Sequence, residues 1–153
     1  MEYILAYDFG TSGVKAALVD LEGRMIGSKE SGYPLIYTEE GYVEQEPTAY
    51  WKAVCEATRD VVESTGIGKE TVTGMSFSTQ GLGIIPLGKD GTILYNNISW
   101  VDSRARAQAD EINAKLGRHE FDAADVLPKY LWIKQNMPKL YEKTAYLPAA
   151  DRR

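Results

Sequence analysis

The sequence of 153 residues contains a single cysteine, Cys55, and a single histidine, His119. One cysteine cannot close a disulfide within the chain, and the two residues are too few for a structural zinc site. We expect Cys55 to pack inside a helix and His119 to lie on the surface. A lone cysteine is typical of the reducing cytoplasm, which is the compartment that we predict.

The sequence also lacks long apolar runs and an excess of basic over acidic residues. No run approaches the ~18 residues that a membrane span needs, and the first residues lack the basic start of a signal peptide. With 17 Lys and Arg against 22 Asp and Glu, the formal charge is −5. Nucleic-acid-binding domains normally carry a clustered basic face. We therefore expect neither a membrane nor a nucleic acid as a partner.

The composition that is present indicates a globular protein. Hydrophobic residues make up 44% of the sequence and charged residues 25%. A chain of this size buries roughly 70% of its unfolded surface, which is enough for one core. We predict one domain over residues 1–153.

A turn rich in hydrogen-bond donors lies near the start of the chain. Residues 3–7 and 14–19 are apolar runs of strand length, so the polar residues between them predict a hairpin. Its glycines can adopt positive φ and expose their backbone N–H groups. Thr11 and Ser12 add hydroxyl donors, and Lys15 adds a positive charge. The candidate phosphate ligands are Gly10, Thr11, Ser12, Gly13 and Lys15.

Asp8 ends the first of these predicted strands. Carboxylate oxygens with retained waters suit Mg²⁺, so Asp8 is the candidate metal ligand. The alternative is an ordinary hairpin with an acidic cap. A turn needs fewer donors than D-F-G-T-S-G supplies, which favours the binding site.

The segment from Asp8 to Lys15, D-F-G-T-S-G-V-K, resembles the first phosphate motif of the FGGY carbohydrate kinases. These enzymes belong to the actin-like, ribonuclease H-like ATPases. The resemblance implies an α/β fold of that type, with a mixed sheet and flanking helices. It also implies ATP and Mg²⁺ as cofactors, with Asp8 organising the metal. No G-x-x-x-x-G-K-[ST] is present, so the motif is not a P-loop.

The remaining pattern predicts alternating strands and helices. We expect a third antiparallel strand, a long irregular loop, an amphipathic helix, a strand with one face of small residues, a second hairpin and two further helices. In order, these cover residues 24–28, 32–47, 48–65, 71–79, 84–94, 98–116 and 129–136.

Further segments are similar to the same family. Residues 41–51 resemble its G-x-V-E-x-x-P-x-x-x-W segment, residues 98–104 resemble I-x-W-x-D-x-R, and residues 131–141 resemble its K-L-x-W-L-x-x-x-x-P stretch. The resemblance implies that one wall of a sugar pocket consists of Gln80, Gly81, Trp100, Asp102 and Arg104. Taken alone, Asp102 would be a helix N-cap.

FGGY kinases are much longer than this chain and consist of two lobes with the active site between them. The resemblance therefore implies an incomplete first lobe, with the general-base aspartate and the adenosine site encoded beyond Arg153. No catalytic residue is expected in this chain, which alone should be inactive and should self-associate or form a homodimer. The last residues, 151–153, show no helix or strand pattern.

The predicted activity is ATP-dependent phosphorylation of a ketose or polyol, as in xylulose kinases. Glycerol kinases follow the equivalent of Gln80 with Arg-Glu and xylulose kinases with Met-His, whereas this chain has Gly81-Leu82. The sequence therefore leaves the sugar open. One alternative is a non-catalytic actin-like ATPase module of the filament or chaperone type, which has no use for a sugar wall. The other is a metal-dependent nuclease of the same core fold.

Overall fold

The computed structural model describes residues 1–147, which form two compact units. Unit 1 contains residues 1–34 and 48–80. Unit 2 contains residues 35–47 and the chain from residue 81 onward. The expectation for residues 151–153 lies outside the described residues.

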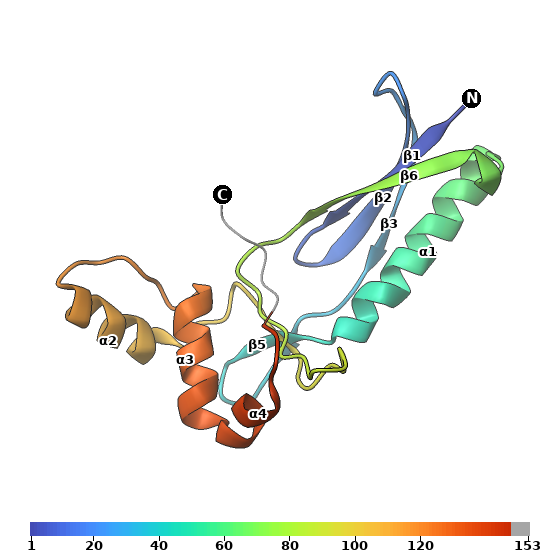
Figure 1. Ribbon diagram of the computed structural model, residues 1–153. Coiled ribbons are helices and arrows are strands. Elements are labelled where there is room, and N and C mark those ends of the chain that lie inside the picture. Colours follow the sequence, from blue (N-terminus) through green and yellow to red (C-terminus); the bar gives the residue numbers. More distant parts are fainter. Residues whose placement is uncertain (148–153) are drawn as a thin grey trace. The chain divides into compact units, whose positions relative to one another are not determined.

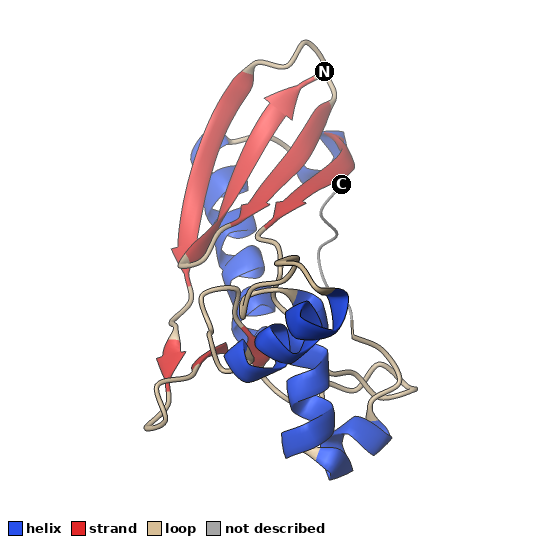
Figure 2. Cartoon of the chain, turned by 90° about the vertical axis from the view of Figure 1, so that its left-hand side faces the viewer, coloured by secondary structure: helices blue, strands red, loops and turns tan. Residues whose placement is uncertain are grey.

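Unit 1 is a four-stranded mixed sheet in the order β3-β2-β1-β6, with one long helix along it (Figure 1). β1, β2 and β3 are antiparallel neighbours, as predicted, and β6 is parallel to β1. Figure 2 shows the four strands side by side. The strands are β1 (Tyr3–Phe9), β2 (Gly13–Asp20), β3 (Met25–Gly32) and β6 (Val72–Thr79).

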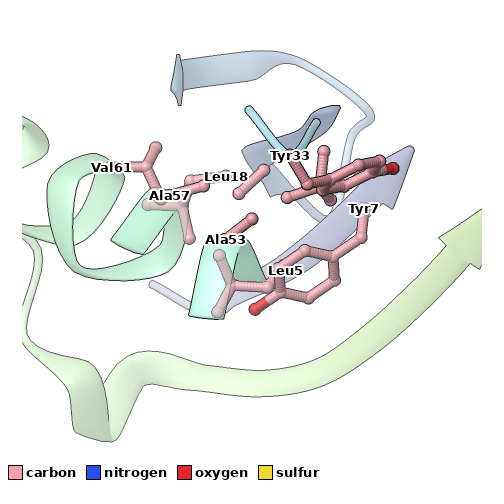
Figure 3. Packing of buried hydrophobic residues seen from close by; sticks show 9 residues of the cluster. Leu5, Tyr7, Leu18, Tyr33, Ala53, Ala57 and Val61 are labelled. Atoms are coloured by element: carbon pink, nitrogen blue, oxygen red, sulfur yellow. The ribbon is translucent and has the colours of Figure 1, made fainter. Parts of the chain in front are cut away.

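The helix α1 (Pro47–Thr65) packs on one face of this sheet. It begins with a proline in its first turn, where no backbone N–H is needed, and is followed by Gly66 at φ 67°. Alternate strand residues and one stripe of the helix form the core (Figure 3). Leu18 and Val61 are fully buried, and such burial contributes about 1.5–3 kcal/mol for each side chain.

The described part of unit 2 has a small antiparallel sheet and three helices. Its fully buried apolar core is Ile84, Ile98 and Ile133, with aromatic and aliphatic side chains around them. The strands are β4 (Ile36–Tyr37), β5 (Val43–Gln45) and β7 (Asn97–Ile98), and the helices are α2 (Arg106–Leu116), α3 (Val126–Asn136) and α4 (Pro138–Lys143).

The structure corrects three boundaries. Residues 32–47 are not without elements, because they contain β4 and β5. The second hairpin consists of isolated bridges, Leu87 to Ile93 and Ile84 to Ile98, rather than full strands. The helix expected from residue 98 begins at Arg106, and residues 97–98 form β7 instead. Short pairings of this kind depend on remote partners and leave no local period.

Other elements agree more closely with expectation. Gly117 ends α2 in the left-handed conformation at φ 66°, as its position predicts. α3 starts at Val126, three residues before the prediction, and α4 was not predicted. A 3₁₀ turn, η1 (Lys69–Thr71), precedes β6. Within residues 1–147, every helix is too short or too polar to cross a bilayer.

Candidate functional site

Hydrogen bonds from Tyr33 hold the backbone of the loop between β1 and β2. The Gly10 N–H donates to the Gly13 carbonyl over 2.9 Å. The Tyr33 hydroxyl donates to the carbonyls of Gly10 and Gly13, at 2.5 and 2.9 Å, and the Tyr33 N–H donates to the Ser12 carbonyl. Burial raises the pKa of Tyr33 to about 12, so its hydroxyl stays protonated and can donate at neutral pH.

The glycines of this loop have a different role from the predicted one. Neither Gly10 nor Gly13 has a positive φ. At Gly13 the reason for glycine is close approach, because a Cβ there would lie 2.7 Å from the Ser31 carbonyl oxygen. β3 therefore lies against the loop at a distance that no other residue type permits.

Asp8 and Lys15 lie on the face of the sheet opposite α1. They are direct partners in the β1–β2 register, and their chain neighbours Tyr7 and Val14 are buried against α1. A cavity of ≈ 220 Å³ opens beside them. It is lined by Asp8, Gly10, Ser12, Gly13, Val14, Lys15, Glu30, Ser31 and Gly32. Four of the five predicted phosphate ligands and the predicted metal ligand thus share one cavity.

Glu30 is the residue at this cavity that sequence reasoning missed. Its carboxylate accepts from Lys15 Nζ at 2.8 Å, and both side chains are largely exposed. The hydrogen bond and charge of Glu30 raise the pKa of Lys15. β3 brings Glu30 opposite Lys15, and no sequence pattern indicated this pairing.

In unit 2, Asp102 and Arg104 are buried and bonded to each other. Asp102 Oδ1 accepts from the Arg104 backbone N–H and from Nε, both at 2.9 Å. Asp102 Oδ2 accepts from Arg104 Nη2 at 3.0 Å and from the Val43 N–H at 2.6 Å. Asp102 is not the N-cap of α2, because residue 105 occupies that position.

Arg104 extends this network to Glu44. Nη2 donates to Glu44 Oε1 at 2.9 Å, and Glu44 also accepts from Tyr95 and Asn96. Burial opposes the charge of Arg104, but its hydrogen bonds to Asp102 and Glu44 outweigh this effect, so the pKa of Arg104 is raised. Glu44 is the glutamate of the segment that resembled G-x-V-E-x-x-P. The sequence therefore indicated this glutamate but not its pairing with Arg104.

Two aromatic rings enclose the guanidinium. Its central carbon lies 4.2 Å from the Tyr42 ring centre and 4.9 Å from that of Trp132. Arg104 Nη1 is buried without a hydrogen-bond partner among the described residues, and the rings compensate part of that cost. Trp132 belongs to the segment that resembled K-L-x-W, which explains why an aromatic residue is needed there.

The other predicted sugar ligands are more accessible. Trp100 is 41% exposed, between buried Ser99 and buried Asp102. Gly81 is partly exposed, and a Cβ there would meet nothing within 4 Å. Gln80 is the last residue of unit 1, where its N–H donates to the Phe9 carbonyl. The structure brings Asp102 and Arg104 into contact, and a direct contact of either with a sugar remains a prediction.

Comparison with known proteins supports the resemblance. The family model described as FGGY family of carbohydrate kinases, N-terminal domain, matches residues 3–150. The xylulose kinase of Bacillus subtilis (strain 168) is 34% identical over 152 residues, which is 95% of this chain and 30% of that protein.

Two solved structures from Lactobacillus acidophilus are similar as well. Ligand-bound xylulose kinase has a TM-score of 0.86 and 28% identity, and the match covers 96% of this chain and 31% of that one. Gluconate kinase has a TM-score of 0.82 and 29% identity over the same shares. The chain therefore spans less than a third of the length of these relatives.

Proposed function

This chain belongs to the FGGY family of carbohydrate kinases, and we propose that it is the N-terminal part of an ATP-dependent kinase for a ketose or polyol. The observation that carries the proposal is the ≈ 220 Å³ cavity of unit 1, with loop donors, a cation and a carboxylate around it. Phosphoryl transfer depends on positioning and charge stabilisation more than on covalent chemistry. These groups can supply both.

We assign the γ-phosphate contacts to the 10–13 loop and Lys15. Exposed ion pairs are weak, so a phosphate can displace Glu30 from Lys15 at little cost. The Gly10 N–H is already bonded to the Gly13 carbonyl, so Gly10 would shape the loop while Thr11, Ser12 and Gly13 supply donors. Tyr33, bonded to two loop carbonyls, keeps the donors in place.

Asp8 fits a hydrated Mg²⁺. The carboxylate is exposed at the cavity, and one carboxylate with retained waters is a common way to hold this ion beside phosphates. Within residues 1–147 no three metal-binding side chains gather, so Asp8 would share the ion with phosphate oxygens. Magnesium held there would neutralise charge on the transferred group.

For the sugar we propose that Gln80, Gly81 and Trp100 make contact. Trp100 offers an accessible ring for a carbon skeleton, and a glutamine amide both donates and accepts hydrogen bonds. Asp102 and Arg104 are buried, so we propose that they support this wall rather than touch the sugar. Their hydrogen bonds fix the turn that presents Trp100.

Relatives named xylulose kinase and glycerol kinase support a ketose or polyol as the substrate class, and the name gluconate kinase adds a sugar acid to the substrates to be tested. The resemblance implies larger or polar residues at the positions of Gly81 and Leu82 in xylulose and glycerol kinases, so we expect the preferred sugar to differ in shape. We further propose a cytoplasmic protein that acts as a homodimer, with the general-base aspartate and the adenosine site in a second lobe. Expectations for the whole enzyme rest on relatives that are about three times longer.

The test is ADP release by the full-length protein with D-xylulose, glycerol and D-gluconate in turn. At least one substrate should stimulate ADP release well above the rate with ATP alone. In the same assay the control variant Lys52→Met, a substitution on the exposed side of α1, should release ADP at the wild-type rate. ATP binding with no sugar-dependent ADP release would favour the non-catalytic actin-like module instead.

A further inference from the structure

Lys129 of α3 is fully buried, which is unusual for a lysine. Its ammonium donates to the Leu82 carbonyl at 2.8 Å and to the Ser99 carbonyl at 2.7 Å. These two residues lie far from Lys129 in the sequence and belong to separate segments of unit 2. One side chain therefore joins three parts of the fold.

The position of these carbonyls matters because each lies next to a proposed sugar contact. Leu82 follows Gly81, and Ser99 precedes Trp100. Both segments are also bridged through Ile84 and Ile98, whose backbones exchange hydrogen bonds at 3.0 and 3.2 Å. Lys129 thus holds the two segments at the points where they leave this bridge.

Leu82 is the only described non-glycine residue with positive φ, at 63°. A branched side chain disfavours this left-handed conformation, so the surrounding contacts must maintain it. The hydrogen bond from Lys129 is such a contact. Without it, residue 82 should relax to negative φ and carry its neighbour Gly81 with it.

The environment of Lys129 explains why the amino group stays in place. Burial lowers its pKa to about 8, so it remains largely protonated at pH 7. Asp102 and Asp125 favour the charge, and Arg104 opposes it. A charged donor to a buried carbonyl forms a stronger hydrogen bond than a neutral one.

We propose that Lys129 is a positioning residue of the sugar site, which fixes the backbone of Leu82 and Ser99 and thereby sets Gly81 and Trp100 for the substrate. The inference rests on the proposed function for the identity of the substrate. That Lys129 holds the two backbone segments in place does not depend on which substrate binds. Separate experiments therefore test the hydrogen bonds of Lys129 and the effect on the substrate.

The first test needs no substrate. Hydrogen exchange of the full-length protein is compared with that of Lys129→Met, which keeps an unbranched stem and loses the donors. Loss of two such hydrogen bonds should speed exchange in residues 81–84 and 99–103 by about ten-fold, with β1 and α1 unchanged. Wild-type exchange in both segments would overturn the proposal.

The second test uses kinetics with D-xylulose. Lys129→Met should raise the KM for sugar about ten-fold and leave the KM for ATP within about two-fold. Lys134→Met is the matched control, because Lys134 is an exposed lysine of the same helix. An unchanged sugar KM, or equal rises for both substrates, would contradict the proposal. If the wild-type enzyme does not use D-xylulose, the substrate assignment fails while the exchange test still decides on Lys129.

A second substitution separates positioning from general loss of stability. Asparagine adopts the left-handed conformation more readily than leucine. In the Lys129→Met background, Leu82→Asn should therefore slow exchange in residues 81–84 toward the wild-type rate and leave residues 99–103 fast. Exchange that stays equally fast in both segments would count against a role through Leu82.

If Lys129→Met does not fold, the wild-type protein still provides a test. An ammonium bonded to two buried carbonyls is protected from solvent. Nitrogen NMR of lysine-labelled protein should then show one slowly exchanging lysine ammonium. If all lysine ammonium groups exchange as fast as surface ones, the proposal is wrong.

Discussion

The charged side chains of the candidate site are exposed in unit 1 and buried in unit 2. In unit 1, Asp8, Lys15 and Glu30 are exposed at the cavity, where they can turn toward a ligand. In unit 2, Asp102 and Arg104 are buried and bonded to each other. Exposed charges contribute little to stability, whereas breaking a buried pair is costly. Substitutions in unit 1 should thus affect activity, and those in unit 2 should affect folding as well.

Asp8→Asn keeps the shape of the side chain and removes its charge. In the full-length enzyme we expect kcat to fall by about 10²-fold or more with the sugar KM nearly unchanged, because the metal contact weakens. Steady-state kinetics over a range of Mg²⁺ concentrations would measure this. Asp60→Asn, at an exposed position of α1, is the control. An equal loss of sugar affinity would show that Asp8 is structural.

Asp102→Asn should act on both stability and sugar binding. The substitution removes one of the two carboxylates bonded to buried Arg104, and removing one partner of a buried ion pair costs about 3–5 kcal/mol. Urea unfolding would measure the loss, and sugar kinetics on the folded fraction should show a raised KM because the Trp100 turn loosens. Stability lost with sugar kinetics intact would place Asp102 outside the sugar wall.

The pKa of Lys129 predicts a pH dependence of stability. Its folded value of about 8 lies below the ordinary 10.5, so the unfolded chain binds more protons between these values. The contribution of Lys129 to the free energy of unfolding should therefore rise from pH 8 to 10.5, by at most about 3 kcal/mol, and stay constant below pH 8. The difference between wild type and Lys129→Met across pH 7–10 measures it, since other groups cancel. A flat difference would disagree with the burial of the charge.

At the scale of elements, the 10–13 loop depends on its contact with β3. Gly13→Ala would place a methyl group 2.7 Å from the Ser31 carbonyl oxygen, and backbone cannot easily move aside. We expect a loss of about 1–3 kcal/mol and weaker ATP binding, seen by thermal unfolding and nucleotide titration. Gly74→Ala is the control, because its Cβ would meet nothing closer than 3.8 Å. Equal stability of the two variants would show that the loop can shift.

At the scale of the molecule, unit 1 leaves an apolar groove between α1 and β6. The cavity measures ≈ 540 Å³, and Trp51, Met75 and Phe77 are 58–72% exposed around it. β6 is also an end strand of the described sheet, so its outer edge is open to pairing. Surfaces of this kind are normally covered by another part of the protein or by a second copy.

The 153-residue chain by itself should therefore self-associate, as the sequence predicted. Phe77→Lys should shift sedimentation velocity profiles toward the monomer by charging the groove. Met25→Lys is the control, since Met25 is 62% exposed on β3 at the other end of the sheet. A wild-type chain that remains monomeric at high concentration would count against an exposed association surface.

The sequence by itself determined the local elements and the candidate phosphate loop. The apolar run over residues 3–7 indicated β1, and helical spacing ended by Gly66 indicated α1. These signals are local, because backbone geometry repeats every two residues in a strand and every 3.6 in a helix. The motif from Asp8 to Lys15 was readable for the same reason, since its candidate ligands lie close together in the sequence.

Only the tertiary structure decided which distant residues meet. Glu44 lies 60 residues from Arg104, and Lys129 lies 30 residues from Ser99, yet each pair is joined in the interior. The pairing of Lys15 with Glu30 likewise follows from the β2–β3 register. Burial of an ion requires a partner but does not specify where in the chain it comes from. For this reason Asp102 and Arg104 were recognised as important, while their burial became visible only in the fold.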